Sequence, residues 1–303
     1  MASVQPDLCG CQESMTGAGG GGDLFMQPEG FHVYSHPFIS DHVQTFGAPS
    51  HMGLIGKLLV WLVWIFAGAL RVPVLGRVLS WLPYWLEIVR ELSGIAWLFE
   101  AYKPLWVPFF CNTILVSPKL QPSNQPVQYD SCLIDPPGLH MLGCHGVLVT
   151  LQSGQTAWMI NMHLNHDVSQ DGARRRCDEL KRVLHWRSRK SAGEDHGLII
   201  VGDCNTLWKG GEPLKKLMQE HGLRSAHAVV HGQEPAYTWP SGIVAPFMDL
   251  DGAQDWPKGV CLDFIWVCDR IKVAAAGIAG NEPHADDPTL YPSDHIAVWA
   301  DLL

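Results

Sequence analysis

The sequence is short of positive charge. Its 303 residues include 21 lysines and arginines against 30 aspartates and glutamates, a formal net charge of -9 at pH 7. A protein whose affinity rests on neutralising many phosphates needs the opposite balance. The composition therefore disfavours nucleic acid as a partner, although a local basic groove is compatible with an acidic average.

Signals for export and for cysteine-based structure are also lacking. The first residues, MASVQPDLCGCQES, have neither the basic start nor the apolar core of a secretory signal. The nine cysteines are odd in number and scattered, and Cys9 and Cys11 are spaced too closely for a zinc knuckle. We expect reduced thiols and a cytoplasmic location.

Length and hydrophobic content indicate one large core. With 47% hydrophobic residues and no internal repeat, residues 1–303 are expected to form a single domain. Nothing in the sequence indicates the oligomeric state.

Residues 51–110 have an unusual composition and are expected to form a hydrophobic helical insertion within that domain. Residues 53–110 hold six of the thirteen tryptophans and only eight charged residues. Apolar helices with basic residues and a Trp/Tyr belt favour a membrane surface. A buried or partner-binding insert is the second interpretation. A true span is the third, because the longest uncharged run, Leu58–Leu70, is short for one.

The rest of the chain alternates between strand and helix patterns. Strands are expected at residues 31–39, 146–154, 156–164, 197–205, 259–268 and 295–302, with a polar helix at 171–190 and a turn at Ser153 and Gly154. Arg174, Arg175 and Arg176 could face a phosphate, but three consecutive residues point in different directions around a helix, so we expect them to be solvated.

Polar clusters accompany the apolar strands. They are Asn161 with His163, Asp203 with Asn205, Asp263 alone, and Asp294 with His295. Burying such groups without a purpose is costly, because an ionised carboxylate in an apolar setting must be paired or bind a metal. Convergence of these clusters on one site explains all of them together.

Five motifs in chain order resemble the signature of the endonuclease/exonuclease/phosphatase superfamily, which has the DNase I-like fold. They are CQE at 11–13, INMHL at 160–164, GDCN at 202–205, CLDFIWV at 261–267 and SDH at 293–295. Each is weak alone, but five in order over nearly the whole chain are specific. The stretches HGVLVTLQSG and TWPSG are most similar to the generic hydrolase and neutral sphingomyelinase-like branches.

The resemblance implies an α/β four-layer sandwich, two packed mixed β-sheets flanked by helices. It implies Glu13 and Asp294 as ligands of Mg²⁺, with Mn²⁺ as the alternative ion. It further implies that His295 is a general base oriented by Asp263, that Asp203 and Asn205 position the nucleophile and the phosphate, and that His163 donates a hydrogen bond to phosphate.

The sequence departs from the family pattern at its beginning. The first family strand, with its asparagine near the metal, has no counterpart before the CQE motif. We therefore expect either a truncated or mispredicted gene product whose missing first strand would impair activity, or another segment in place of that edge.

The favoured function is metal-dependent hydrolysis of a phosphoester by a histidine-activated water. The acidic charge and the aromatic insertion favour a lipid or small-molecule headgroup as the substrate, with a membrane surface as a partner through residues 51–110. A nuclease or deadenylase is the alternative within enzymes. A catalytically impaired, membrane-associated scaffold is the alternative outside them.

Overall fold

A computed structural model gives the fold of part of the chain. It describes residues 6–15, 31–35, 110–120, 128–134, 143–167, 169–190, 195–206, 213–243 and 259–303. Residues 51–109 of the expected insertion lie outside these ranges. The described residues form two compact units, one over Pro6–Val147 and the other over Leu148–Leu303.

The first unit contains antiparallel strands. β3 (Phe110–Val116) pairs on one side with β1 (Leu8–Met15) and on the other with β2 (His32–Ser35). The register of β1 shifts between Cys11 and Ser14, the stretch that holds Glu13. A 3-10 turn at Pro118–Leu120 follows β3, and β4 (Tyr129–Leu133) pairs with β5 (Gly143–Thr150), which runs on into the second unit.

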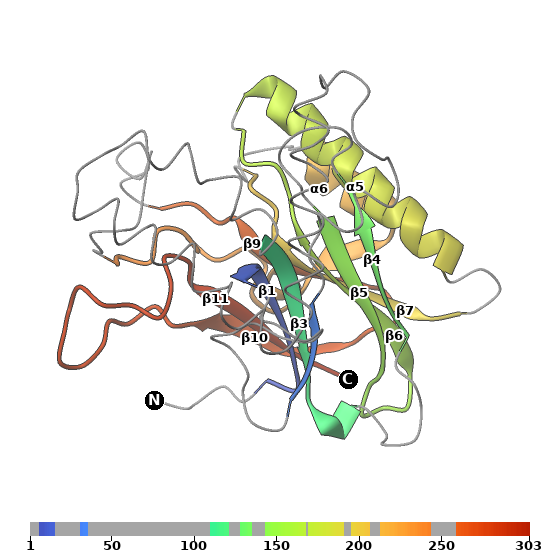
Figure 1. Cartoon of the computed structure of the whole chain (residues 1–303), viewed down its shortest axis with the longest axis horizontal. Coiled ribbons are helices and arrows are strands. Elements are labelled where there is room, and N and C mark those ends of the chain that lie inside the picture. Colours follow the sequence, from blue (N-terminus) through green and yellow to red (C-terminus); the bar gives the residue numbers. More distant parts are fainter. Residues whose placement is uncertain are drawn as a thin grey trace, which may run out of the picture. The chain divides into compact units, whose positions relative to one another are not determined.

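The second unit is built around a mixed sheet (Figure 1). Parallel strands β6 (Thr156–His163) and β7 (Gly197–Asp203) are joined through α5 (Gln170–Lys190). β9 (Asp263–Cys268) runs antiparallel on the other side of β7, and β8 (Leu223–Ser225) pairs with β9. The remaining elements are α6 (Pro213–Glu220), α7 (Ala226–His231) and the antiparallel pair β10 (Val273–Ala279) and β11 (Ala297–Leu302).

Continuous apolar runs place β6 and β7 in the core. Six consecutive residues of β6, from Ala157 to Met162, are buried, and so are Leu198, Ile199 and Ile200 of β7. The indole rings of Trp158 in β6 and Trp186 in α5 meet edge to face, with their centroids 6.0 Å apart. Burial of such large apolar surfaces is the main favourable contribution to folding. It fixes α5 against the strand that leads to His163.

Several sequence-based expectations are confirmed. Strands cover parts of all six expected ranges, and α5 matches the predicted helix. The turn between β5 and β6 closes through hydrogen bonds from Leu151 N to the Gln155 carbonyl and from Gly154 N to the Leu151 carbonyl. The mixed sheet with helices confirms the α/β class. The four-layer stacking, the single domain and the missing first strand stay predictions.

The exposed-face prediction for the three arginines of α5 is wrong for one of them. Arg174 and Arg175 are exposed, whereas Arg176 is only 3% exposed. Its guanidinium donates to the backbone carbonyls of Asn165 (3.1 Å) and Asp167 (2.5 Å). These acceptors in the loop after β6 compensate for the burial of the charge.

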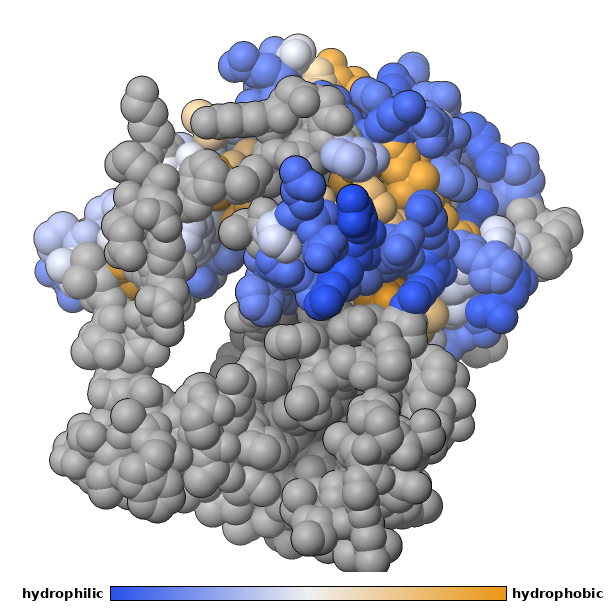
Figure 2. Space-filling view, turned by 90° about the horizontal axis from the view of Figure 1, so that it is seen from above, coloured by the Kyte–Doolittle hydropathy of each residue, from blue (hydrophilic) through white to orange (hydrophobic). Residues whose placement is uncertain are grey.

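The described surface is largely polar. Figure 2 shows one face on which the described residues are mostly hydrophilic, with smaller hydrophobic areas between them. Exposed large apolar side chains in the described ranges are Val229, Val230, Leu290 and Leu303. No helix within those ranges combines the length and apolar character that crossing a bilayer requires.

Candidate active site

The carboxyl ends of β6 and β7 bring the first two motif residues together. His163 and Asp203 are register partners on these parallel strands, and Leu164 N donates to the Asp203 carbonyl at 3.0 Å. Gly202 makes the close approach possible. A Cβ atom at Gly202, whose φ is +146°, would lie 1.8 Å from the carbonyl oxygen of Met162. Only glycine fits this position, which explains the GD pair of the motif.

Asp263 reaches the same place from the opposite chain direction. As the first residue of antiparallel β9 it is the register partner of Asp203. Cys204 N also donates to the Leu262 carbonyl at 2.8 Å, which extends the pairing beyond the strands. Two aspartates at 5% and 8% exposure thus lie at neighbouring strand ends.

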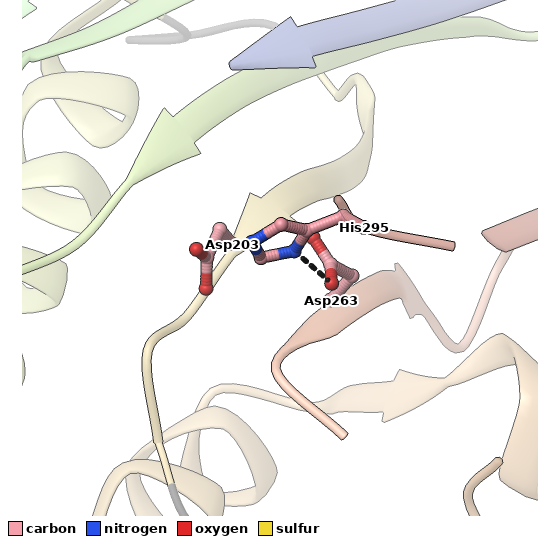
Figure 3. Close-up of side chains that lie close together, drawn as sticks. All are labelled: Asp203, Asp263 and His295. Atoms are coloured by element: carbon pink, nitrogen blue, oxygen red, sulfur yellow. Dashed lines mark hydrogen bonds and ion pairs between the residues drawn. The ribbon is translucent and has the colours of Figure 1, made fainter. Parts of the chain in front are cut away.

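His295, just before β11, completes the cluster (Figure 3). Its Nδ1 lies 2.9 Å from Oδ2 of Asp263, a distance typical of a charge-assisted hydrogen bond. One ligand atom from each of Asp203, Asp263 and His295 lies within 4.8 Å of the other two. The imidazole of His295 is therefore oriented by the carboxylate of Asp263 and lies near a second carboxylate, that of Asp203.

His163 and Asn205 lie beside Asp203. Nε2 of His163 is 3.5 Å from Oδ2 of Asp203 and 2.9 Å from Nδ2 of Asn205. The Asn205 amide also donates to the Leu164 carbonyl at 2.9 Å, and the Asn205 backbone N donates to Oδ1 of Asp203 at 2.7 Å. Asn205 adopts a φ of 45°, a left-handed conformation that asparagine tolerates better than most residues.

The electrostatic environment raises the pKa values of Asp203 and His295, which favours the neutral form of the carboxyl and the charged form of the imidazole. Burial, followed by repulsion from Asp263, raises the pKa of Asp203 to about 6, against the opposing pull of the two histidines and the Asn205 backbone. Burial alone lowers the pKa of His295. The hydrogen bond and charge of Asp263, aided by Asp203 and Asp294, outweigh it and raise that pKa to about 9. Such shifts in a cluster are typical of functional sites.

The structure gathers all the predicted site residues except Glu13 in the second unit. Asp294 lies at the edge of the cluster, with Oδ2 4.0 Å from Nε2 of His295. The backbone of Glu13 belongs to β1 in the first unit, and its side chain lies outside the described part. Its role as a metal ligand stays a prediction.

The donor set fits a hard divalent cation. Asp203 and Asp263 offer carboxylate oxygens, the ligands that Mg²⁺ prefers. A cation beside Asp203 would also favour the ionised form that burial disfavours. His295 could act as a third, nitrogen ligand, but its Nδ1 is already bonded to Asp263. That bond leaves Nε2 as the ring nitrogen that is available to take a proton or to bind the cation.

Sequence reasoning missed four residues that support this site. Thr238 and Ser241 bond to the segments carrying Asp263 and His295, while Arg176 and Glu179 hold the loop after His163. The TWPSG stretch, which holds Thr238 and Ser241, indicates only a similarity to a family branch. Nothing in the sequence indicates that Arg176 and Glu179 are buried, because charged residues of an amphipathic helix usually lie on its solvated face.

Comparison with known proteins finds similarity at the level of solved structures. No protein-family model matches the sequence, and no curated protein is a match. The chain is similar to D. rerio TDP2 complexed with single strand DNA product, with 19% identity over 64% of this chain and 73% of that one and a TM-score of 0.46. It is also similar to a mannosyl-6-phosphatase from Bacteroides thetaiotaomicron VPI-5482, with 13% identity over 63% and 70% and a TM-score of 0.45.

A third similar structure is the endonuclease/exonuclease/phosphatase from Bacteroides vulgatus. Its identity is 13% over 63% of this chain and 69% of that one, with a TM-score of 0.45. The likeness concerns the fold.

Proposed function

We propose that the chain is a divalent-metal-dependent phosphoester hydrolase of the endonuclease/exonuclease/phosphatase superfamily. The observation that carries the proposal is the convergence of residues from four separate motifs. Nε2 of His163 lies 3.5 Å from Oδ2 of Asp203, and Nδ1 of His295 lies 2.9 Å from Oδ2 of Asp263. One ligand atom from each of Asp203, Asp263 and His295 lies within 4.8 Å of the other two. A structural role alone does not require two carboxylates and two imidazoles at one set of strand ends.

In the proposed mechanism His295 is the general base. Its Nδ1 is held by Asp263, so Nε2 is the nitrogen that accepts a proton from the attacking water. Asp263 stabilises the imidazolium that forms and fixes the ring orientation. A pKa near 9 keeps His295 protonated at neutral pH in the metal-free protein, so the proposal requires added positive charge nearby to lower it.

Asn205 and His163 are proposed to contact the phosphate. Nδ2 of Asn205 and Nε2 of His163 lie 2.9 Å apart, and the proposal requires that phosphate oxygens replace this mutual contact so that both side chains donate to them. Asp203 and Asp294 are proposed to hold Mg²⁺ or Mn²⁺, and the ion would supply Lewis-acid polarisation of the phosphoryl oxygen when bound. Asp203 also orients Asn205 through its backbone N–H.

For the substrate we propose a lipid or small-molecule headgroup. The formal charge of -9 and the tryptophan-rich composition of residues 53–110 support this choice over nucleic acid.

A substrate panel tests the activity. p-Nitrophenyl phosphate, bis-p-nitrophenyl phosphate, sphingomyelin vesicles and a single-stranded oligonucleotide are each assayed in Mg²⁺, in Mn²⁺ and in EDTA, with His295→Gln as the matched variant. We expect hydrolysis that requires metal and His295. Activity confined to the oligonucleotide would support the nuclease alternative, and no metal-dependent activity on any substrate would support the scaffold.

A further inference from the structure

Thr238 connects the two chain segments that carry the proposed base and its partner. This residue is 0% exposed. Its hydroxyl oxygen accepts hydrogen bonds from the backbone N–H groups of Leu262 (2.9 Å) and Asp263 (3.1 Å). Its carbonyl accepts from Ile296 N at 2.7 Å, the residue after His295. One buried residue therefore bonds to both sides of the Asp263 and His295 pair.

Ser241 makes a second connection three residues later. Its backbone N donates to the Asp294 carbonyl at 2.7 Å, and its hydroxyl donates to the Ser293 carbonyl at 2.5 Å. Ser241 itself is 6% exposed, whereas its partner Ser293 is exposed and Asp294 is half-buried. The segment before His295 is thus held by Ser241 and the residue after it by Thr238.

Backbone pairing fixes this connecting segment itself. Val260 and Trp239 exchange two backbone hydrogen bonds of 2.7 and 3.0 Å, and Thr238 N also donates to the Val260 carbonyl at 2.8 Å. The segment that holds Thr238 is therefore paired with the chain three residues before Asp263.

We propose that Thr238 and Ser241 are positioning residues for the reaction. They hold the Asp263 carboxylate within hydrogen-bond reach of His295 Nδ1, at 2.9 Å (Figure 3). A hydrogen bond weakens steeply with distance and misalignment, and a small displacement of a catalytic group lowers the rate greatly. The inference for catalysis rests on the proposed hydrolase function, whereas the hold on the pair can be tested without any activity.

The direct test is the NMR resonance of the His295 Nδ1 proton in the metal-free protein, assigned by its loss in His295→Gln. Thr238→Val removes the acceptor of two buried N–H groups at similar side-chain volume, and we expect the low-field resonance to shift upfield or to exchange away. Thr238→Ser restores the hydroxyl and should restore the resonance. Thr156→Val is the matched control, because Thr156 bonds His196 at 2.7 Å at the other end of β6.

Kinetics provide the second measurement once a substrate is known. Thr238→Val should lower kcat by about 10-fold or more with a smaller change in KM, because positioning acts on the transition state. Thr238→Ser and Thr156→Val should keep most of the rate.

A folded Thr238→Val protein with an unchanged His295 resonance would overturn the inference. If the wild-type chain is inactive on every substrate, that result counts against the hydrolase proposal only. The NMR comparison then still decides whether Thr238 and Ser241 position the pair. If Thr238→Val does not fold, Ser241→Ala takes its place. A shifted resonance in that variant would then support the inference, and an unchanged one would overturn it.

Discussion

His295 and Asp263 form a hydrogen-bonded pair, Nδ1 to Oδ2 at 2.9 Å, across 32 positions of the sequence. The side chain of Asp263 is 11% exposed and that of His295 is 28% exposed. The carboxylate is therefore shielded while the imidazole keeps an accessible edge, as a base that meets a water requires.

Asp263→Asn should abolish most of the activity. The amide keeps the shape but removes the charge that stabilises the imidazolium, so kcat should fall by about 10²- to 10⁴-fold. Steady-state kinetics in saturating Mg²⁺ measure the effect. Asp269→Asn is the control, because Asp269 is an exposed partner of Arg224 and should leave kcat unchanged. Equal rates for wild type and Asp263→Asn would contradict the base assignment.

Asn205→Gly should lower kcat by about 10²- to 10³-fold, the usual cost of removing one transition-state donor. Glycine is the informative replacement, because Asn205 has a φ of 45° and alanine would add backbone strain to the loss of the amide. The thermal midpoint should change little. A large loss of stability with normal kcat per folded molecule would assign Asn205 to structure instead.

Metal-free protein should lose stability as the pH rises through the titration of Asp203. The folded pKa of about 6 lies above the ordinary 3.8, so this group's contribution is fully present below pH 3.8 and is lost as the pH rises through 6. One pKa unit corresponds to about 1.4 kcal/mol. In EDTA, Asp203→Asn should therefore raise the thermal midpoint by several degrees at pH 7.5 and hardly at all at pH 4.

The exposed Asp287 serves as a control, because its pKa is shifted in the opposite direction from that of Asp203. Hydrogen bonds from Thr289 lower the pKa of Asp287, so Asp287→Asn should not raise the midpoint at pH 7.5. A gain for Asp203→Asn that is equal at both pH values would show that the raised pKa of Asp203 is not its cause.

Arg176→Ala should destabilise the protein far more than Arg174→Ala. The first change leaves the carbonyls of Asn165 and Asp167 without a buried donor, at a cost of about 2–3 kcal/mol. The second removes an exposed pair with Asp171, worth less than about 1 kcal/mol. Urea unfolding measures both. Similar losses would contradict the distinction between the buried and the exposed arginine.

Glu179 extends the same test to the loop after His163. Its carboxylate accepts from Asn165 N at 2.9 Å, and the side chain is buried. Glu179→Gln retains an acceptor oxygen and should preserve stability better than Glu179→Ala, which retains none. Equal stability of the two variants would show that this hydrogen bond contributes little.

The strand ends of the site could be predicted because their chemistry is local. Apolar runs such as GLIIVGD indicate a buried strand, and the polar residue that ends each run must find a partner. Asp203 followed from that reasoning, whereas Asp263 begins its strand and His295 precedes one, so both needed the motif order as well. The family resemblance added the roles, and the pairing distances came only from the structure.

The supporting contacts could not be predicted, because they depend on geometry between distant segments. The Thr238 hydroxyl reaches Asp263 N across 25 positions, and threonine in a polar stretch carries no sign of such a bond. β8 and α7 were not predicted, since three and six residues are too short for a periodic signal. The other described strands and α-helices outside the expected ranges are β1, β3, β4, β10 and α6.

The narrow fit at Gly202 makes the site sensitive to the smallest possible change. One extra methyl group there would wedge against the Met162 carbonyl and push the tips of two adjoining strands apart. Because His163 and Asp203 each lie one residue further along, Gly202→Ala would separate two residues of the proposed site although the added methyl group carries no charge.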